Sequence, residues 1–336
     1  MVRGKQVLGR MLVAACAMAI TGGITGCSLL TPPLSDAQDA TARQAIDDSL
    51  LVRSGTLTVA LDTRNAPQVM TGTEGDLQGY AVDLACALAS RLGLDVSFVS
   101  ATSPESPLAD GEADLYIGAS SDDDAASITI MDGYLENATA VFGAAGDAAL
   151  TASALADATF AVQGGSATEE VVYSVASPSN VRTCNNVNEC FDALAAGEVD
   201  YVACDATAGA YLARAQSEVS FCGTLSNVDS YGIAFMSRAT ELANEVMSAF
   251  AQMENDGTID ALRQAWYGDL PADLEGQLIE GVDPAAAADQ GLTFASDADD
   301  AAAADDASAD DAAATDGTQA DADASSTSGS ISTGTL

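Results

Sequence analysis

Short apolar runs alternate with helical patterns over most of this chain, and that alternation limits its fold more than any other feature. In the first half, the predicted strands are residues 57–61, 95–99 and 113–117, and residues 80–92 form a predicted amphipathic helix. Short strands that alternate with helices are typical of βαβ units, whose strands run parallel. The sequence therefore predicts an α/β fold.

A second series of the same kind begins after an extended run at residues 138–144. Its predicted strands are residues 160–163, 180–183, 200–203 and 219–222. A predicted return strand at residues 231–236 precedes two predicted helices, residues 239–254 and 257–266. Two such series predict a two-lobed fold in which two parallel-rich sheets are joined by hinge strands. We expect lobe 1 to comprise residues 55–140 and 231–282, and lobe 2 to comprise residues 141–230.

The N-terminal segment has the pattern of an export signal. Basic residues up to Arg10 precede an apolar run at residues 11–20, which is too short to span a membrane. The tetrad Ile-Thr-Gly-Cys at residues 24–27 resembles the lipobox of bacterial lipoproteins. That resemblance implies a signal peptide at residues 1–26 and lipid on Cys27, which would anchor the chain to the extracytoplasmic face of the cell membrane. The alternative is a buried cysteine after an ordinary signal.

Both flanks of the expected lobes are polar. Residues 27–54 are the expected lipid anchor and linker, and residues 283–336 consist almost entirely of Asp, Ala, Ser, Thr and Gly. A segment of the latter composition buries too little apolar surface to offset its loss of conformational entropy. We therefore predict that residues 283–336 form a disordered acidic tail.

Charge and composition exclude several classes of function. The formal net charge is −39, so the chain lacks the clustered Lys and Arg that nucleic acid binding needs. It contains no histidine, and it contains no lysine after Lys5. Histidine acid–base catalysis, lysine Schiff bases and the P-loop lysine are therefore excluded. We predict neither a cofactor nor a metal site.

Five cysteines follow Cys27, which fits an oxidising compartment. Four of them, Cys184, Cys190, Cys204 and Cys222, are close in sequence and allow three disulfide connectivities. We favour Cys184 with Cys190 and Cys204 with Cys222. Cys86 is expected to be a buried free thiol on the apolar face of its helix. A cysteine metal site is the alternative, although this spacing is not usual for zinc.

Five sequence motifs occur in an order and spacing that resemble those of one protein family. They are Gly55-Thr56-Leu57-Thr58-Val59, Gly79-Tyr80-Ala81-Val82-Asp83-Leu84, Val162-Gln163-Gly164-Gly165-Ser166, residues 193–200 followed by Asp205, and Asp256-Gly257-Thr258 before Trp266. Over residues 55–268 the chain is similar to family 3 of the bacterial extracellular solute-binding proteins, the amino-acid-type binding proteins of ABC importers. The resemblance implies a periplasmic-binding-protein-like type II fold, a hinged cleft for a small-molecule ligand, an ABC permease as partner, and a monomer.

Two features of lobe 2 are candidate ligand contacts. Gly164 and Gly165 follow a predicted strand and precede a predicted helix, so the amides of Gly165, Ser166 and Ala167 can bind an anion at the positive helix end. The alternative is a glycine turn in which Ser166 caps the helix. Asp205 follows a predicted strand, at the position where the resemblance implies a contact with the ligand's α-ammonium group. Its alternative role is to cap the next helix.

In lobe 1, the loop after the first strand carries Asp62, Arg64 and Asn65 as candidate ligand contacts. The resemblance implies an aromatic platform in this loop, and Asn65 takes its place. Tyr134 or Tyr231, near the crossings between the lobes, can supply an aromatic ring instead.

The segment after residues 113–117 departs from the family pattern. Members that bind amino acids place an arginine there, which clamps the α-carboxylate of the ligand. This chain has Ser120, Ser121 and three aspartates at residues 122–124 instead. Either Arg64 replaces that arginine from another direction, or the ligand lacks an α-carboxylate. The aspartates favour a cationic ligand or Ca²⁺, or they cap a helix and decorate an already acidic surface.

The sequence predicts a lipid-anchored solute receptor rather than an enzyme. We expect it to capture a small polar, amino-acid-like molecule in the cleft and to deliver it to an ABC permease. One alternative is a ligand-sensing or interaction module without a transport role, and another is a binder of a cationic solute that lacks an α-carboxylate. Acid–base catalysis by Asp62 and Asp205 is a further hypothesis, which the lack of histidine and lysine disfavours.

Overall fold

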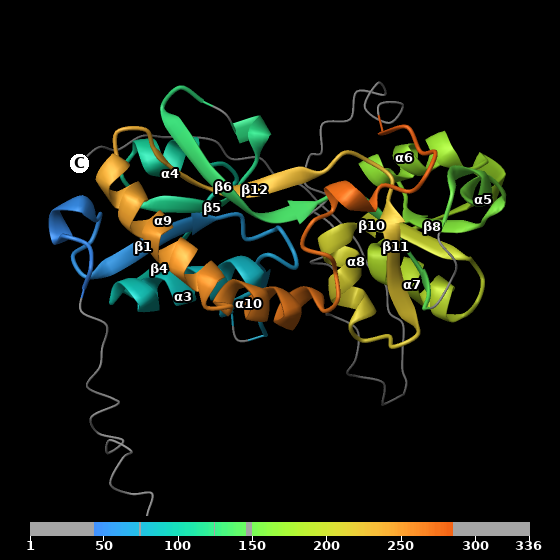
Figure 1. Ribbon diagram of the computed structural model, residues 1–336, viewed down its shortest axis with the longest axis horizontal. Helices are drawn as coiled ribbons and strands as arrows, with labels where there is room; N and C mark the ends of the chain where they lie inside the picture. The colour runs from blue at the N-terminus through green and yellow to red at the C-terminus, as the bar shows by residue number, and fades with distance from the viewer. Residues whose placement is uncertain (1–43, 74, 124, 146–149, 285–336) are drawn as a thin grey trace, which may run out of the picture. The chain divides into compact units, whose positions relative to one another are not determined.

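The computed structural model describes residues 44–73, 75–123, 125–145 and 150–284, and it contains two five-stranded sheets (Figure 1). We call the sheet that holds the first strand, together with its helices, lobe 1, and the other sheet with its helices lobe 2. The predicted leader, the lipidation site Cys27 and residues 285–336 of the predicted tail lie outside the described residues.

In lobe 1 the strands lie in the order β4-β1-β5-β12-β6. Strand β1 pairs in parallel with β4 and β5, whereas β12 pairs antiparallel with β5 and β6. The strands are β1 (Thr56–Leu61), β4 (Asp95–Ser100), β5 (Leu115–Ala119), β6 (Ile128–Asn137) and β12 (Asp229–Met236). A small hairpin of β2 (Met70–Thr71) and β3 (Leu77–Gln78) follows β1.

Lobe 2 has the strand order β11-β7-β10-β8-β9. Strand β8 pairs in parallel with β9 and β10, and β7 pairs antiparallel with β10 and β11. The strands are β7 (Thr139–Ala144), β8 (Phe160–Gln163), β9 (Val181–Cys184), β10 (Tyr201–Asp205) and β11 (Val219–Thr224). The predicted two-lobed α/β architecture is confirmed, and each of its sheets mixes parallel with antiparallel pairs.

Helices cover both sheets. In lobe 1, α9 and α10 pack on α3, which packs on β1 and β4; in lobe 2, α6 and α7 pack on β8 and β10, and α8 packs on β7 and β11. The helices are α3 (Tyr80–Leu92), α4 (Glu105–Ala109), α5 (Ala152–Asp157), α6 (Ala167–Val175), α7 (Val187–Ala195), α8 (Ala206–Ala213), α9 (Thr240–Asn255) and α10 (Thr258–Tyr267). Short 3-10 turns are η1 (Asp48–Leu50), η2 (Ser121–Asp123), η3 (Pro178–Asn180) and η4 (Glu275–Gln277). Within the described ranges, none of the helices has the length and apolar character needed to cross a membrane.

Helix α3 begins at a point where the backbone requires glycine. Gly79 has a φ of +136°, and a Cβ atom there would lie 2.2 Å from the carbonyl oxygen of Gln68. The same close approach lets the Ala81 amide donate a hydrogen bond to that carbonyl at 3.0 Å. The helix ends at Gly93, whose left-handed conformation closes it. The glycine of the Gly79-Tyr80 motif therefore fixes where α3 meets the loop after β1.

Helix α8 lies close to the second sheet because a glycine occupies the contact. A Cβ atom on Gly209 would lie 2.1 Å from the Phe142 ring and 2.7 Å from the sulfur of Cys204. Phe142 and Cys204 are both buried in the core. This packing ties the first turns of α8 to β10, whose end carries Asp205.

Two of the passages of the chain between the lobes lie at neighbouring points, and we call these two the crossings. Strand β6 ends at Asn137 and β7 begins at Thr139, so a single residue separates a lobe-1 strand from a lobe-2 strand. The return runs from Thr224 at the end of β11 to Asp229 at the start of β12, and Asp229 pairs with Asn137. The sequence pattern does not predict β6, because the apolar alternation that begins at Ile128 is interrupted at residues 132–133. The pairing of β6 with β12 also shifts register there, on either side of Gly232.

The end of the described chain returns to lobe 2. Leu278 forms a bridge with Thr224 of the edge strand β11, Glu280 forms one with Thr151, and Ile279 is buried in the core of lobe 2. The expectation that all of residues 231–282 belong to lobe 1 is therefore corrected. Helices α9 and α10 pack on lobe 1, whereas the last residues cover the edge of the second sheet, where unpaired backbone groups are available for pairing.

The five cysteines of the described chain are free thiols, so both predicted disulfides are absent. Cys204 and Cys222 cannot pair, because β7 lies between β10 and β11 and two strand spacings amount to about 9.6 Å. Cys184 and Cys190 do contact each other through their thiols. The prediction of a buried Cys86 is also wrong, since this residue is exposed at the margin of the apolar face of α3.

Candidate functional site

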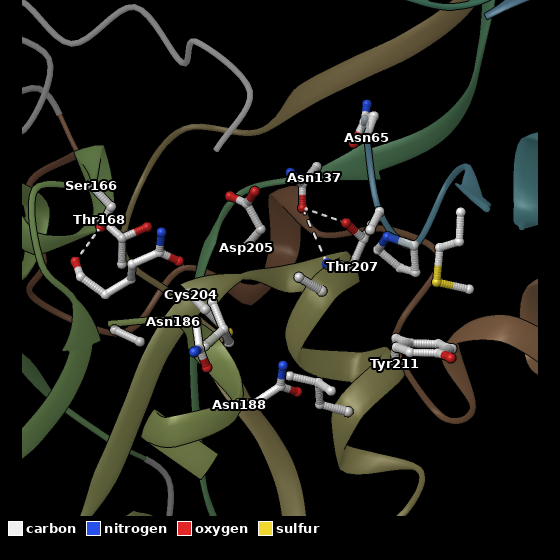
Figure 2. A pocket seen from close by; sticks show the side chains of 18 of the residues that line it. Asn65, Asn137, Ser166, Thr168, Asn186, Asn188, Cys204, Asp205, Thr207 and Tyr211 are labelled. Atoms are coloured by element: carbon white, nitrogen blue, oxygen red, sulfur yellow. Dashed lines mark hydrogen bonds between the residues drawn. The ribbon is translucent and has the colours of Figure 1, made fainter. Parts of the chain in front are cut away.

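A pocket lies beside the crossings between the lobes, where the carboxyl ends of lobe-2 strands approach the loop after β1 (Figure 2). It encloses about 1030 Å³ of space, open solvent included. Its walls come from that loop, from both crossings, from the end of β10, from α8 and from the starts of α6 and α7. The polar residues of the lining are Asn65, Asn137, Gln163, Ser166, Thr168, Asn186, Asn188, Cys204, Asp205, Thr207, Tyr211 and Tyr231.

Among the described residues that line this pocket, Asp205 alone is charged. It ends β10 and precedes α8, but its side chain makes no capping hydrogen bond to that helix. Asn137 takes the capping role, since its Oδ1 accepts hydrogen bonds from the Thr207 amide at 3.2 Å and the Thr207 hydroxyl at 3.4 Å. Figure 2 shows Asp205 between this pair and the turn at Ser166. The alternative that Asp205 caps α8 is therefore wrong, and its carboxylate belongs to the pocket.

The start of α6 is capped by the chain itself. The Ser166 hydroxyl accepts a hydrogen bond from the Glu169 amide at 3.2 Å and donates one to the Gln163 carbonyl at 2.8 Å. The Glu169 carboxylate accepts a hydrogen bond from the Gly165 amide at 2.7 Å. This reciprocal arrangement is close to a capping box, and it occupies the Gly165 amide that was a candidate for binding an anion. Ser166 therefore caps the helix and lines the pocket at the same time.

The structure brings some of the predicted ligand contacts into this pocket and leaves others outside its lining. Those in the lining are Asn65, Ser166, Asp205 and Tyr231. Those outside the lining are Asp62, Arg64, Ser120, Ser121, Gly165 and Ala167. Apart from Tyr231, which lies within β12, these residues end or follow strands, as the carboxyl-end rule requires. The direction of each side chain decides which of them reach the pocket.

Arg64 does not take the place of the missing arginine in this structure. Its Nε lies 3.4 Å from Oδ1 of Asp62, and its backbone amide donates a hydrogen bond to the same oxygen at 2.9 Å. The Arg64 side chain is 52% exposed, whereas the Asp62 side chain is 12% exposed. This ion pair holds the two side chains against each other in the loop after β1. Asp62 and Asp205 are therefore not assembled as an acid–base pair in one pocket.

The predicted site omits several residues of the pocket. Asn186 and Asn188 come just after β9, and the rule that ligands bind beyond the carboxyl ends of strands applies to them as well as to Asp205. Thr168 lies on the first turn of α6. Asn137 lies at a crossing that no sequence pattern marks, so only the structure identifies it.

A group of carboxylates lies on the lobe-1 side of the crossings. Burial, and secondly the charge of Asp122, raises the pKa of Asp229. Burial also raises the pKa of Asp123, with a further contribution from Asp122. Burial raises the pKa of Tyr116, and the charges of Asp123 and Asp62 add to that rise. Burial, with a smaller contribution from neighbouring carboxylates, therefore disfavours the charged forms of Asp123 and Asp229.

Replacing Asp229 by asparagine is expected to raise the melting temperature of the ligand-free protein at pH 7. The pKa of Asp229 is raised in the folded state, so the folded protein holds this proton more tightly than the unfolded chain does. The stability that results is fully present below the unfolded pKa of about 3.9 and is lost as the pH rises through the folded pKa. Asparagine has no charge to lose, so the advantage of the variant should shrink as the pH falls toward 4.

Thermal unfolding between pH 4 and pH 8 measures this effect. Asp192→Asn removes the same charge from an exposed position on α7 and serves as the matched control. An Asp229→Asn protein that melts below the parent at pH 7, or whose advantage grows as the pH falls, would contradict the assignment.

The part of the chain that the structure describes contains no group of three or more cysteine, aspartate or glutamate side chains placed to hold a metal ion. Asp122 and Asp123 lie on the turn η2, where Asp123 accepts a hydrogen bond from the Ser120 amide at 3.0 Å. Asp124 is outside the described residues. The geometry of Asp123 therefore stabilises a turn.

Comparisons with known proteins agree with this architecture. A family model for bacterial extracellular solute-binding proteins, family 3, matches residues 57–269. No curated protein sequence matches the chain. An ancestral cationic amino acid solute-binding protein is 26% identical with a TM-score of 0.53, and the match covers 63% of this chain and 96% of that one.

Two other solved structures share the fold. A polar amino acid ABC uptake transporter substrate-binding protein from Streptococcus thermophilus is 16% identical with a TM-score of 0.60, covering 71% of this chain and 96% of that one. The L-cystine solute receptor of Neisseria gonorrhoeae, in its unliganded open conformation, is 18% identical with a TM-score of 0.55, covering 65% of this chain and 95% of that one. At these identities the likeness shows the fold alone.

Proposed function

Because the chain belongs to family 3 of the bacterial extracellular solute-binding proteins, we propose that it captures a small, polar solute with a protonated amino group such as amino acids carry. The pocket beside the crossings is the proposed binding site, and Asp205 is the residue that meets the amino group. The solute then passes to the permease of an ABC importer. Lipid on Cys27 holds the receptor at the extracytoplasmic face of the cell membrane.

The observation that carries this proposal is the position of Asp205. A carboxylate among neutral amides and hydroxyls attracts an ammonium group, and charge-assisted hydrogen bonds of this kind contribute about 1.5–3 kcal/mol each. The neutral side chains around it can orient the rest of a polar ligand. The 26% identical relative is a cationic amino acid binding protein by its description, which supports a ligand that carries an amine.

The connection between the lobes supports capture by closure. Asn137 ends β6 of lobe 1 and caps α8 of lobe 2 through Thr207, and it also lines the pocket. Solute receptors with two lobes close around their ligand by changes at a few hinge residues. A hinge residue that is also a pocket residue gives the ligand a direct means of favouring one arrangement of the lobes.

Thermal unfolding of the purified whole chain with candidate solutes tests the proposal. A ligand at 100 times its dissociation constant adds about 2.7 kcal/mol to the free energy of unfolding, which raises the melting temperature by several degrees. We expect this shift from small solutes with a protonated amine, and no shift from glycerol or succinate. Equal shifts from succinate, or none from any amine, would refute a site built around Asp205.

A further inference from the structure

The pocket offers no positive charge to a ligand. Asp205 is negative, and no arginine of the described chain lines the cavity. Two arginines adjoin it. Arg64 pairs with Asp62, and Arg214 donates a hydrogen bond to the Trp266 carbonyl at 3.2 Å while its guanidinium lies 5.8 Å from the centre of the Tyr211 ring. Each guanidinium is therefore engaged outside the lining, and neither clamps a carboxylate there.

The helix dipole of α6 is also unavailable to an anionic ligand. Helix N-termini bind anions through free amides and the positive end of the dipole. Here the Glu169 carboxylate already sits at that end and accepts the Gly165 amide at 2.7 Å. A second carboxylate placed beside Ser166 and Thr168, the α6 residues of the lining, would therefore meet the negative charge of Glu169 instead of an unoccupied anion site.

A ligand carboxylate would meet the like charge of Asp205 in the pocket. The other described carboxylates of this region, Glu169 of α6 and Asp62, Asp123 and Asp229 of lobe 1, lie outside the pocket lining, and Asp62 is paired with Arg64. Like charges brought together in a binding site cost several kcal/mol. The neutral amides of the pocket give a carboxylate hydrogen bonds but no counter-charge. Only the cationic part of a zwitterion is therefore favoured.

We propose that the pocket selects small organic amines without a carboxylate, such as diamines and guanidino-amines, and rejects the corresponding α-amino acids. This proposal rests on the proposed function and names the class of solute for the same site. One cationic end of the solute meets Asp205, and the neutral amides and hydroxyls of the lining contact the rest of it. The ligand class thus follows from the distribution of charge around the cavity.

Matched pairs that differ by one carboxylate test the proposal. Isothermal titration calorimetry of the whole chain with agmatine and arginine, cadaverine and lysine, and putrescine and ornithine measures the effect directly. We expect at least one amine to bind about 100-fold more tightly than its amino acid, since a cost of several kcal/mol corresponds to two decades or more in affinity.

Two results would overturn the proposal, and they differ in their meaning. If the amino acid binds as tightly as its amine, the selection against carboxylates is refuted while capture of an amine-bearing solute stands. If none of the six compounds binds, the proposed function of this pocket is refuted together with the selectivity.

Glu169→Gln gives a second test that does not depend on which amine binds best. The amide oxygen of glutamine can still accept the Gly165 hydrogen bond, so the helix cap is kept while the negative charge is removed. The ratio of the dissociation constant of the amino acid to that of its amine should fall about 10-fold. Glu170→Gln, on the next and exposed residue of α6, is the matched control and should leave the ratio unchanged. An unchanged ratio in Glu169→Gln would contradict the role given to this carboxylate.

Discussion

Asp205→Asn should weaken the binding of an amine ligand by at least about 30-fold. The substitution keeps the size and the hydrogen-bonding oxygen of the side chain but removes the negative charge that meets the ammonium group. Breaking one partner of a buried charge pair costs about 2–5 kcal/mol, and each 1.4 kcal/mol is about tenfold in the dissociation constant. Titration calorimetry with the amine that shifts the melting temperature most gives the measurement.

The control for this variant is Asp192→Asn, which removes a charge from the exposed face of α7 in the same lobe. It should bind the amine like the parent, because it lies outside the pocket lining. The melting temperature of the ligand-free Asp205→Asn protein is measured alongside, so that a change in affinity is distinguished from a change in stability. An Asp205→Asn protein that keeps full affinity would place the ligand elsewhere.

Cys27→Ala should transfer nearly all of the exported protein from the membrane fraction to the soluble fraction. Stable anchoring needs two acyl chains, at about 0.8 kcal/mol per buried CH₂, and the thioether-linked diacylglycerol that the lipobox resemblance implies would supply them. Without a thiol at residue 27 no such linkage forms. The rest of the chain is strongly acidic, with a net charge of −39, so anionic lipid surfaces do not hold it.

Fractionation of expressing cells, followed by the intact mass of the membrane-bound form, measures this result. Cys16→Ala, inside the predicted signal peptide, is the matched control and should leave the protein on the membrane. A Cys27→Ala protein that stays with the membranes through a high-salt wash would contradict lipidation at this residue.

Local patterns in the sequence predicted α3, α9, α10 and most strands well. Residues 80–92 were predicted as a helix and form α3 with the same bounds, because the apolar period and the flanking glycines Gly79 and Gly93 are all local signals. Strand β5 begins two residues later than predicted. The reason is Asp114, whose carboxylate accepts hydrogen bonds from the amides of Val52 and Thr58 at 2.7 Å each, a contact over more than fifty residues of sequence.

The candidate site could be predicted only in part, because the directions of side chains decide which residues face the pocket. The sequence showed that Asn65, Ser166 and Asp205 follow strands, and such positions meet at one edge of an α/β sheet. It did not show that Asp62 would hold Arg64, nor that Glu169 would close the start of α6. Each of these pairings depends on side-chain directions within a loop, which periodicity does not encode.

The sequence by itself determined that this chain is a two-lobed α/β protein, because strand and helix periods are local properties, and its motifs resemble those of the solute-binding proteins. Only the tertiary structure decided what the pocket contains. Asn137 caps α8 across 70 residues of sequence, β7 separates Cys204 from Cys222, and Asp205 becomes the single charge of the described lining. These outcomes depend on which distant segments pack together, and packing is fixed by the whole fold.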